Sequence, residues 1–481
     1  YTYTNNDAKY LIETNKKGYF NLIFSSLGFE SKTIPVKIDD TNKEIKIDVV
    51  LKEKPFALDE VVIHAELPMS IKKDTISYKT KFFTNGTEQT VEDLLKNIPG
   101  LNIDSNGTIK VGNQEIEKLM IDGDDLFEKG YKILSKNMPA YPIEEIEILK
   151  KYSNNRLLKG VEESNKVALN LKLNEKSKRI WFGNIKIGLN FKNRHELLGN
   201  LMNFGKKNKY YFLTNLNNTG KDVTGEIENI IKPFRFNEPA SVGDNQQVNN
   251  LIGLPKTSLN FKKSRTNFNN AKLLSLNAIF NPTKKLKIKT LGFFNQDEND
   301  FYKNNIINVT ANGTNFTNTE NLKFRNKKSI GFGKLDFRYN ISKTKMLEST
   351  TKYNNGNANG QSNIIFNGAS TIENLKSTNT LFDQKISYSN KFKEKKVFLL
   401  TARFIDEKTP QNYTINQFFY QDLFPNFTNT NNVQQQSKNQ MQFTGFEAHL
   451  LDRKKNGDLL EVQFGNTFRR DKLKTIFTLF E

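Results

Sequence analysis

The sequence has no cysteine, one tryptophan and no long apolar run among its 481 residues. The absence of cysteine excludes both a disulfide framework and thiolate chemistry, and with them a small secreted scaffold held by disulfides. No run of about 18 apolar residues is available for a membrane-spanning helix. The mean hydropathy is −0.63. These absences do not exclude a membrane-spanning β-barrel, because each of its strands needs only about ten residues with every second one apolar.

Positive charge is abundant, with 72 Lys and Arg against 52 Asp and Glu and a formal net charge of +20. The lysines are scattered along the chain, and many occur in short turns rather than along one helix or groove. This distribution favours a solvated basic surface, or affinity for the anionic headgroups of a lipid membrane, over a nucleic-acid site. We therefore predict no nucleic-acid partner.

Motifs for metal binding and catalysis are missing. His64, His195 and His449 lack cysteine partners and metal-ligand spacing, so we predict no metal site. A carboxylate cluster, residues 122–125 with Glu128, does not match the twelve-residue calcium loop, and we interpret it as a solvated turn. No phosphate-binding loop, nucleophile elbow or paired-acid motif occurs. We predict neither catalysis nor a cofactor.

The first part of the chain has the pattern of a small all-β unit. Gly18 and Gly28 each open a run of strand-forming residues, and apolar residues alternate with polar ones over 45–51. Four or five strands in about fifty residues predict a β-sandwich that lacks its first strands.

This unit and the stretch after it resemble a known family. The segments that carry the resemblance read GYFNLIFSSLGFES, LKEKPFALDEVVI and, over 90–123, TVEDLLKNIPGLNIDSNGTIKVGNQEIEKLMIDG. They are similar to the carboxypeptidase-regulatory-like domain and the plug domain of TonB-dependent outer-membrane receptors of Bacteroidota. The resemblance implies a plug inside a barrel of 22 strands and energised uptake of a ligand.

Local signals support the predicted plug domain independently. Thr90 can cap a helix that carries Val91, Leu94 and Leu95 on one face. Apolar and polar residues alternate over 167–173, as expected for a last plug strand. Glycine and asparagine mark tight connections. We predict plug turns at Pro99 and Gly100, at Asn106 and Gly107, and at Asp122 and Gly123.

From Ile180 to Glu481 the sequence repeats a period-two pattern, and we expect no helix there. Leu274 and Leu276 alternate with Ser275 and Asn277, for example. Such strands have one polar and one apolar face, which we assign to the lumen and the lipid, and a sheet in lipid must close. The pattern predicts eleven strands, near 181–191, 196–204, 209–216, 268–280, 286–295, 328–340, 346–355, 379–390, 397–406, 441–451 and 459–469.

The connections between these strands fall into two alternating classes. Five are short and rich in lysine: 205–208, 281–285, 341–345, 391–396 and 452–458. Four are long and rich in Asn, Thr and Gln: 217–267, 296–327, 356–378 and 407–440. Outer-membrane barrels have the same asymmetry of short periplasmic turns and long extracellular loops. Ligand-binding residues would lie in the long loops, but their generic composition does not identify them.

The predicted fold is mainly β, with an N-terminal β-sandwich, a small α+β plug and an antiparallel transmembrane β-barrel. Eleven is an odd number and half of the family's 22, so we expect about the first half of the barrel and a chain truncated at both ends. The expected domains are an incomplete carboxypeptidase-regulatory-like sandwich (1–54), a linker (55–72), the plug (73–178) and the barrel (179–481). Residues 1–178 would be periplasmic or inside the barrel.

The function implied is plug-gated uptake of a bulky ligand, such as a glycan, peptide or metal chelate, across the outer membrane. The expected partners are outer-membrane lipid, the TonB complex and a surface lipoprotein or other outer-membrane subunit. An exposed strand rich in Val and Ile can be captured by strand addition, or it can simply connect domains. The candidate TonB-coupling segment consists of Asp59, Glu60, Val61, Val62 and Ile63.

Two alternatives remain open. The first is a receptor-like barrel that does not transport and serves as a structural subunit of an outer-membrane assembly, secretion or surface-lipoprotein complex. It is favoured by residues 154–165, which lack the glycine-rich run of many such plugs. The second is a soluble adhesin built of β-sandwiches.

Overall fold

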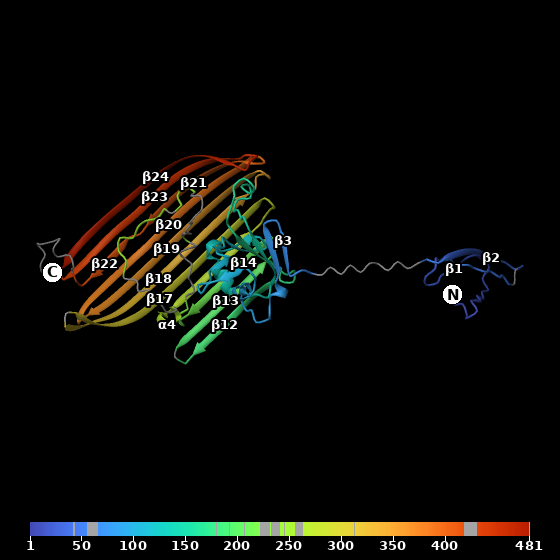
Figure 1. The fold of residues 1–481 in the computed structure, drawn as a ribbon, viewed down its shortest axis with the longest axis horizontal. Coiled ribbons are helices and arrows are strands. Elements are labelled where there is room, and N and C mark those ends of the chain that lie inside the picture. Colours follow the sequence, from blue (N-terminus) through green and yellow to red (C-terminus); the bar gives the residue numbers. More distant parts are fainter. Residues whose placement is uncertain are drawn as a thin grey trace. The chain divides into compact units, whose positions relative to one another are not determined.

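The computed structural model describes residues 1–41, 44–54, 66–178, 180–191, 193–205, 207–221, 231, 241–244, 246–254, 263–311, 313–417 and 431–480 (Figure 1). The chain divides into two compact units, Tyr1–Glu66 and Leu67–Glu481. Each unit is described by itself.

The first unit contains one antiparallel pair of strands, β1 (Gly18–Phe24) and β2 (Lys32–Ile38). Gly28 lies in the connection with a φ of +83°, a conformation that favours glycine. The strand expected over 45–51 is not formed. In that stretch the Ile47 carbonyl accepts a hydrogen bond from the Tyr10 hydroxyl at 2.8 Å. Just after it, Glu53 forms a single β-bridge with Phe29.

The second unit begins with a small α+β domain, residues 67–178, which we call the inner domain. Its main sheet has the strand order β3-β4-β10-β11-β8-β9, and a smaller sheet has the order β5-β6-β7. The strands are β3 (Met69–Lys72), β4 (Thr75–Lys79), β5 (Leu101–Ile103), β6 (Ile109–Val111), β7 (Gln114–Glu115), β8 (Leu119–Ile121), β9 (Asp124–Asp125), β10 (Ile143–Leu149) and β11 (Ala168–Leu173). The helices are η1 (Thr80–Phe82), α1 (Val91–Lys96), η2 (Glu128–Gly130) and α2 (Tyr131–Asn137).

Helix α1 forms as the sequence predicts. The Thr90 side chain accepts a hydrogen bond from the Asp93 backbone N–H, and the Asp93 carboxylate accepts one from the Thr90 N–H, which completes a capping box. Val91, Leu94 and Leu95 are buried on one face of the helix. The apolar face therefore builds the core of the inner domain.

The rest of the unit is one large antiparallel sheet (Figure 1). Its strands are β12 (Trp181–Asn190), β13 (Arg194–Phe204), β14 (Asn208–Asn217), β15 (Phe268–Asn269), β16 (Ala271–Phe280), β17 (Leu286–Ala311), β18 (Thr314–Tyr339), β19 (Lys345–Phe366), β20 (Ala369–Lys393), β21 (Lys396–Lys408), β22 (Gln411–Ile415), β23 (Asn432–Arg453) and β24 (Leu459–Phe480). Neighbours in sequence pair with each other, apart from the short β15 and β22. A four-residue helix, α4 (Lys263–Thr266), is an exception to the expectation of no helix after Ile180.

Two of the predicted long loops are strands instead. β17 and β18 have 26 residues each and pair over their whole length, and β19 and β20 do the same through Phe366 and Ala369. Residues 296–327 and 356–378 are mostly polar, and their apolar residues occur in adjacent pairs such as Ile306 and Ile307 or Ile364 and Ile365, so they carry no regular hydrophobic alternation to reveal a strand. The available signal was an Asn-Gly pair in the middle of each stretch, and Asn367 and Gly368 adopt φ of 47° and 88° in such a turn.

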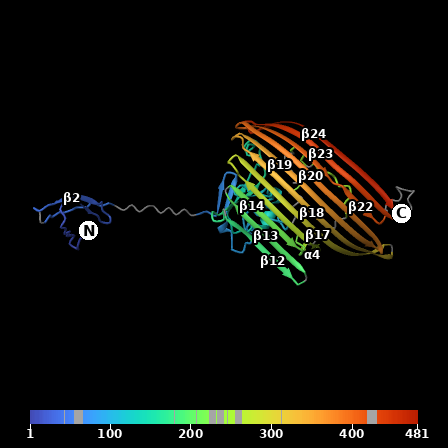
Figure 2. The same ribbon diagram turned by 180° about the vertical axis from the view of Figure 1, so that it is seen from behind.

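The two faces of the sheet differ as the alternation predicts. Figure 2 shows the strands of the sheet side by side from behind. Leu274 and Leu276 are 61% and 44% exposed on the outer face, while Ser275 and Asn277 are buried on the face toward the inner domain, which we call the inner face. The inner face is not purely polar, however. Where it meets the inner domain it is apolar, with Phe204, Tyr211, Phe293 and others in one shared core. Among the described residues, no helix has the length and apolarity needed to cross a membrane.

Candidate functional site: the interface between the inner domain and the sheet

A tight turn directs the acidic cluster at the sheet. Asp122 and Gly123 both have positive φ, 47° and 79°, and they reverse the chain between β8 and β9. The Gly123 N–H donates to the Asn170 side chain at 2.7 Å, which fixes the turn on β11. The next residues, Asp124 and Asp125, are consequently placed in the interface.

Asp124 and Asp125 of the cluster are buried and Glu128 is partly buried, which corrects the interpretation as a solvated turn. Asp124 is 6% exposed; its carboxylate contacts Lys209 of β14 at 2.7 Å and also pairs with Lys287 of β17. Glu128 pairs with Lys334 of β18. The charges of the turn are therefore neutralised by lysines from the sheet, a partner that the local sequence does not reveal. We call Asp124 and Glu128, with Lys209, Lys287 and Lys334, the clasp.

A second buried pair supports the clasp from within the inner domain. Asp125 is 5% exposed and contacts Lys118 at 2.9 Å. Burial alone would raise the pKa of Asp125, but the positive charge of Lys118, followed by that of Lys289, outweighs burial and lowers it. The acidic segment thus stays ionised beside the sheet.

The clasp carboxylates have depressed pKa values for the same reason. Burial by itself favours the protonated form of Asp124, yet Lys209 and Lys287 hold its pKa below the ordinary value. Burial likewise opposes ionisation of Glu128, and Lys334, then Lys118 and Lys352, hold the pKa of that carboxyl well below its usual range. The lysines of the sheet therefore favour the ionised form of both acids.

These shifts predict how the interface depends on pH. A carboxyl with a depressed pKa stabilises the folded form fully above its ordinary pKa of about 4, and that contribution is lost as the pH falls through the depressed value. We expect the protection factors of the amides in residues 119–137, which correct the exchange rates for the intrinsic rate at each pH, to stay high from pH 8 down to about 5 and to fall only below about 4. A fall in protection between pH 7 and 5 would contradict this assignment of charge.

Apolar packing surrounds the charges. The rings of Phe127 and Tyr211 meet edge to face with centroids 5.2 Å apart and planes at 88°. Both are almost completely buried, at 1% and 0% exposure. Removal of water around the clasp strengthens its ion pairs, because a lower dielectric raises the energy of each.

A second attachment lies at the short turns of the sheet. The Arg156 guanidinium donates to the Asn340 side chain at 3.0 Å and to the carbonyls of Ser342 and Lys343 at 2.9 and 2.6 Å. Val161 is fully buried against the sheet, and Arg453 donates to its carbonyl at 2.7 Å. The segment that departs from the family pattern, 154–165, therefore fastens the inner domain to this rim.

Part of the connection between β14 and β16 also folds onto the inner face. Arg403 of β21 makes a bidentate pair with Asp383 of β20, both bonds 2.8 Å, and contacts Asp244 of the connection at 2.7 Å. Further along, Glu407 accepts from the Val248 N–H at 3.0 Å. The predicted external loop 217–267 thus has its residues 241–254 bound to the inner face.

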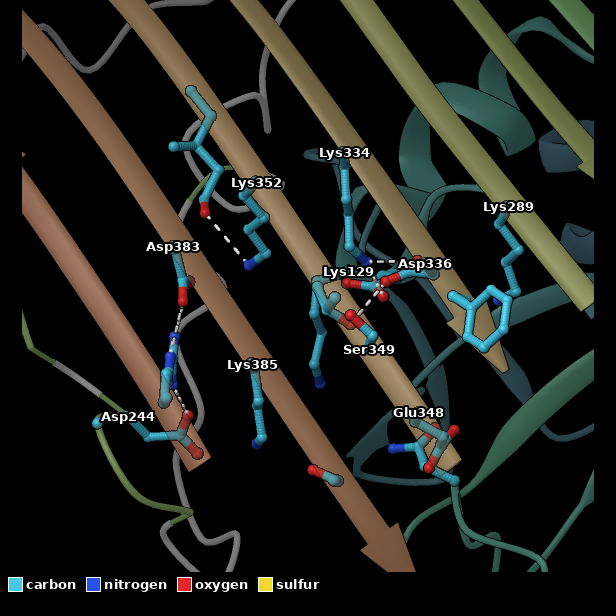
Figure 3. Close-up of a pocket in the computed structure, with 18 of the residues that line it drawn as sticks. Lys129, Asp244, Lys289, Lys334, Asp336, Glu348, Ser349, Lys352, Asp383 and Lys385 are labelled. Carbon is cyan, nitrogen blue, oxygen red and sulfur yellow. Dashed lines mark hydrogen bonds and ion pairs between the residues drawn. The ribbon is translucent and has the colours of Figure 1, made fainter. Parts of the chain in front are cut away.

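A cavity of about 380 Å³ lies between the inner domain, the sheet and this connection. Figure 3 shows Lys334, Lys352 and Lys385 projecting into it from three neighbouring strands. Nine basic and six acidic side chains line the cavity. It is therefore a cationic chamber, which suits anionic rather than neutral or cationic groups.

The other predicted site residues lie elsewhere. Pro99 and Gly100 end the segment after α1, where Gly100 has a φ of 82°, and Asn106 and Gly107 form the connection between β5 and β6. The candidate coupling residues 59–63 lie outside the described residues. Within the described ranges, no group of three His, Cys, Asp or Glu side chains could hold a metal ion.

Sequence reasoning missed the lysines of the clasp. They occupy inner-face positions of strands whose outer positions are apolar. Lys287, for example, lies between Leu286 and Ile288. Buried lysine is rare unless it is paired, so a lysine at such a position was a signal for an acidic partner inside the sheet. Which acid it meets depends on the tertiary arrangement.

Comparison with known proteins identifies the first part of the chain. Residues 1–63 match the model of the CarboxypepD_reg-like domain, which confirms the resemblance seen there in the sequence. None of the curated proteins compared with the chain matches it.

Solved structures similar to the chain include several receptors, which share little sequence identity with it. The siderophore receptor PiuA from Acinetobacter baumannii is 11% identical, with a TM-score of 0.32 over 85% of this chain and 61% of that one. FpvA of P. aeruginosa bound to a pyoverdine is 9% identical, with a TM-score of 0.34 over 86% and 53%. The ferric-catecholate import receptor Fiu from E. coli K12 is 9% identical, with a TM-score of 0.29 over 86% and 76%.

The chain spans 61% and 53% of the lengths of the first two of these receptors. At such identities and TM-scores nothing about its ligand follows from them. The chain is a mainly β protein that carries a CarboxypepD_reg-like domain at residues 1–63, and its structural neighbours include a siderophore receptor and a ferric-catecholate import receptor.

Proposed function

We propose that the protein is a plug-gated receptor of the outer membrane that takes up a bulky ligand with energy from the TonB complex. The observation that carries the proposal is a sheet whose outer face exposes apolar side chains and whose inner face packs against the inner domain. Leu400 and Phe404 of β21 are 41% and 38% exposed on the outer face, while Arg403 between them reaches the inner face. An apolar exterior around a polar, filled interior is the arrangement of a membrane barrel rather than of a soluble sandwich.

The inner domain is the plug of this proposal. The clasp fixes it to the sheet through a few ion pairs on one side. Ion pairs of this kind are lost together once their partners are displaced by a small distance, because Coulomb energy and hydrogen-bond geometry both depend on close contact. Force applied to the N-terminal side of the plug would open a path past it, and residues 1–178 would lie in the periplasm or inside the barrel.

The coupling segment 59–63 gives the direct test. The triple variant V61S/V62S/I63S lowers β-propensity and apolar character, whereas V61I/V62I/I63V keeps both. We expect the purified C-terminal domain of TonB to bind the full chain and the conservative triple variant, and to lose binding to the serine variant. Equal binding to all three would show that the segment is a mere connector.

A structural role in an outer-membrane complex is the second candidate. It is favoured by the anchoring of residues 154–165 on the rim through Arg156 and Arg453, since a permanently fixed inner domain suits a scaffold. Copurification from native membranes separates the two. A scaffold comes with stoichiometric assembly or secretion subunits, and a receptor comes with at most a surface lipoprotein.

A further inference from the structure

We propose that the cavity between the inner domain and the sheet is a binding site for a small oxyanion of the carboxylate or phosphate class, with Lys352 as its direct ligand. The site goes beyond the proposed transport function, because its residues are in place whether or not a ligand is imported. Lys352 lies on β19, is 7% exposed and lines the cavity.

The acidic side chains of the cavity are already engaged by other cations. Lys129 pairs with Glu117 at 2.8 Å, and Arg338 with Glu348 at 2.7 Å. Lys334 pairs with Glu128 and contacts Asp336 at 2.9 Å. The pair of Asp244 and Asp383 holds Arg403. Each of the six carboxylates therefore has a cationic partner other than Lys352.

Among the described residues, Lys352 has an incomplete set of partners. Its ammonium donates to the Ile231 carbonyl at 3.4 Å, and within the part of the chain that the structure describes no carboxylate lies within 4.0 Å of it. A buried ammonium has three N–H donors and a strong need for a counter-charge. An anion in the cavity would supply that charge and accept the remaining hydrogen bonds.

The residues around Lys352 suit a bound anion. Lys385 lines the same cavity from the neighbouring strand β20, diagonal to Lys352 in the register that pairs Lys352 with Asp383. Asp383 pairs with Arg403, so it does not compete with the anion for Lys352. A volume of about 380 Å³ corresponds to roughly a dozen water molecules, enough for a hydrated phosphate or a small polycarboxylate.

The site also adjoins the clasp. Lys334 of β18 pairs directly with Lys352 of β19 in the sheet register, and Lys334 holds Glu128 of the inner domain. An anion beside Lys352 would compete with Glu128 for the charge of Lys334. Occupancy of the cavity would thereby loosen the inner domain.

Titration of the full chain in detergent with inorganic phosphate and with citrate, at constant ionic strength set by chloride, tests the proposal. We expect calorimetric binding of at least one of them to the wild type and to Lys352→Arg, which keeps the charge. Binding should be about ten- to a hundredfold weaker in Lys352→Gln, the effect of losing one hydrogen bond to a charged group. Lys376→Gln, an exposed lysine on β20, is the matched control and should bind as the wild type does.

The arms of the titration separate the sources of the anion. Tighter binding of phosphate indicates a free inorganic ion, and tighter binding of citrate indicates the carboxylate groups of a larger ligand such as a chelate. Absence of binding by both anions, or equal binding in Lys352→Gln, would overturn the proposal. Neither result depends on TonB, so failure here leaves the test of residues 61–63 intact.

Discussion

Replacing Asp124 by Asn is expected to release the inner domain from the sheet. The variant keeps the shape of the side chain but removes the charge that neutralises Lys209, which is 5% exposed, and Lys287. Breaking a buried pair by removing one partner costs about 3–5 kcal/mol, because the other charge is left buried without compensation. Hydrogen exchange of residues 67–178 should accelerate by several orders of magnitude, while exchange in β19 to β21 stays slow.

Two controls make this result specific. Asp74→Asn removes an acid of the same domain whose ion pair with Lys151 is long, at 4.0 Å, and lies at the surface, and it should change exchange little. The double variant Asp124→Asn with Lys209→Gln removes both charges and should recover much of the lost protection. If the single and double variants exchange equally fast, the ion pair is not what holds the domain.

Replacing Leu400 by Arg is expected to prevent stable insertion of the sheet. Leu400 is 41% exposed on the outer face, close to the middle of an apolar stretch of β21 that ends at Phe404. An arginine on the lipid face near the midplane costs about 2–4 kcal/mol. Refolding into lipid vesicles, followed by the heat-modifiable shift of the folded band in gel electrophoresis, should show a strongly reduced folded fraction.

The same charge elsewhere should be tolerated. Thr378 is exposed on β20, in its mostly polar extension and next to the polar residues Ser377 and Asn379, so Thr378→Arg places an arginine on the same surface but outside the apolar belt. It should refold like the wild type, as should Leu400→Phe. If Thr378→Arg and Leu400→Arg behave alike, the outer face of β21 does not contact lipid.

The parts of the fold that sequence predicts well are those with strong local signals. Helix α1 follows from Thr90 and its apolar face, and the wall of the sheet follows from alternation such as Leu274 to Asn277. The short lysine-rich turns also lie where expected, for example between Phe280 and Leu286. In each case neighbouring residues alone determine the structure.

The extensions of the strands could not be read in the same way. From Gln296 onward β17 is mostly polar, and its few apolar residues fall on both faces, as Ile306 and Ile307 do, so the pattern has no period of two. Their pairing depends on the Asn-Gly turns and on the register of the same two strands at 286–295 and 328–339, where apolar positions fix it.

The clasp is a tertiary feature that no local pattern contains. Asp124 and Lys209 lie far apart in the chain, and each by itself resembles a surface charge. Their burial follows only once Phe127 packs on Tyr211 and excludes water. A turn with four acidic residues is ordinarily solvated, and here the sheet supplies the opposite charge instead.

The most direct test of the account is the lipid accessibility of two adjacent residues on β21. The chain has no cysteine, so Leu400→Cys and Thr401→Cys each allow one nitroxide label. Leu400 is exposed on the outer face and Thr401, 8% exposed, faces inward. In lipid vesicles we predict that the label at 400 is relaxed by oxygen dissolved in the bilayer and shielded from a water-soluble nickel chelate, and that the label at 401 has no such preference for oxygen. Equal behaviour of the two labels, or preferential access of the nickel chelate at 400, would contradict the assignment of the outer face to lipid.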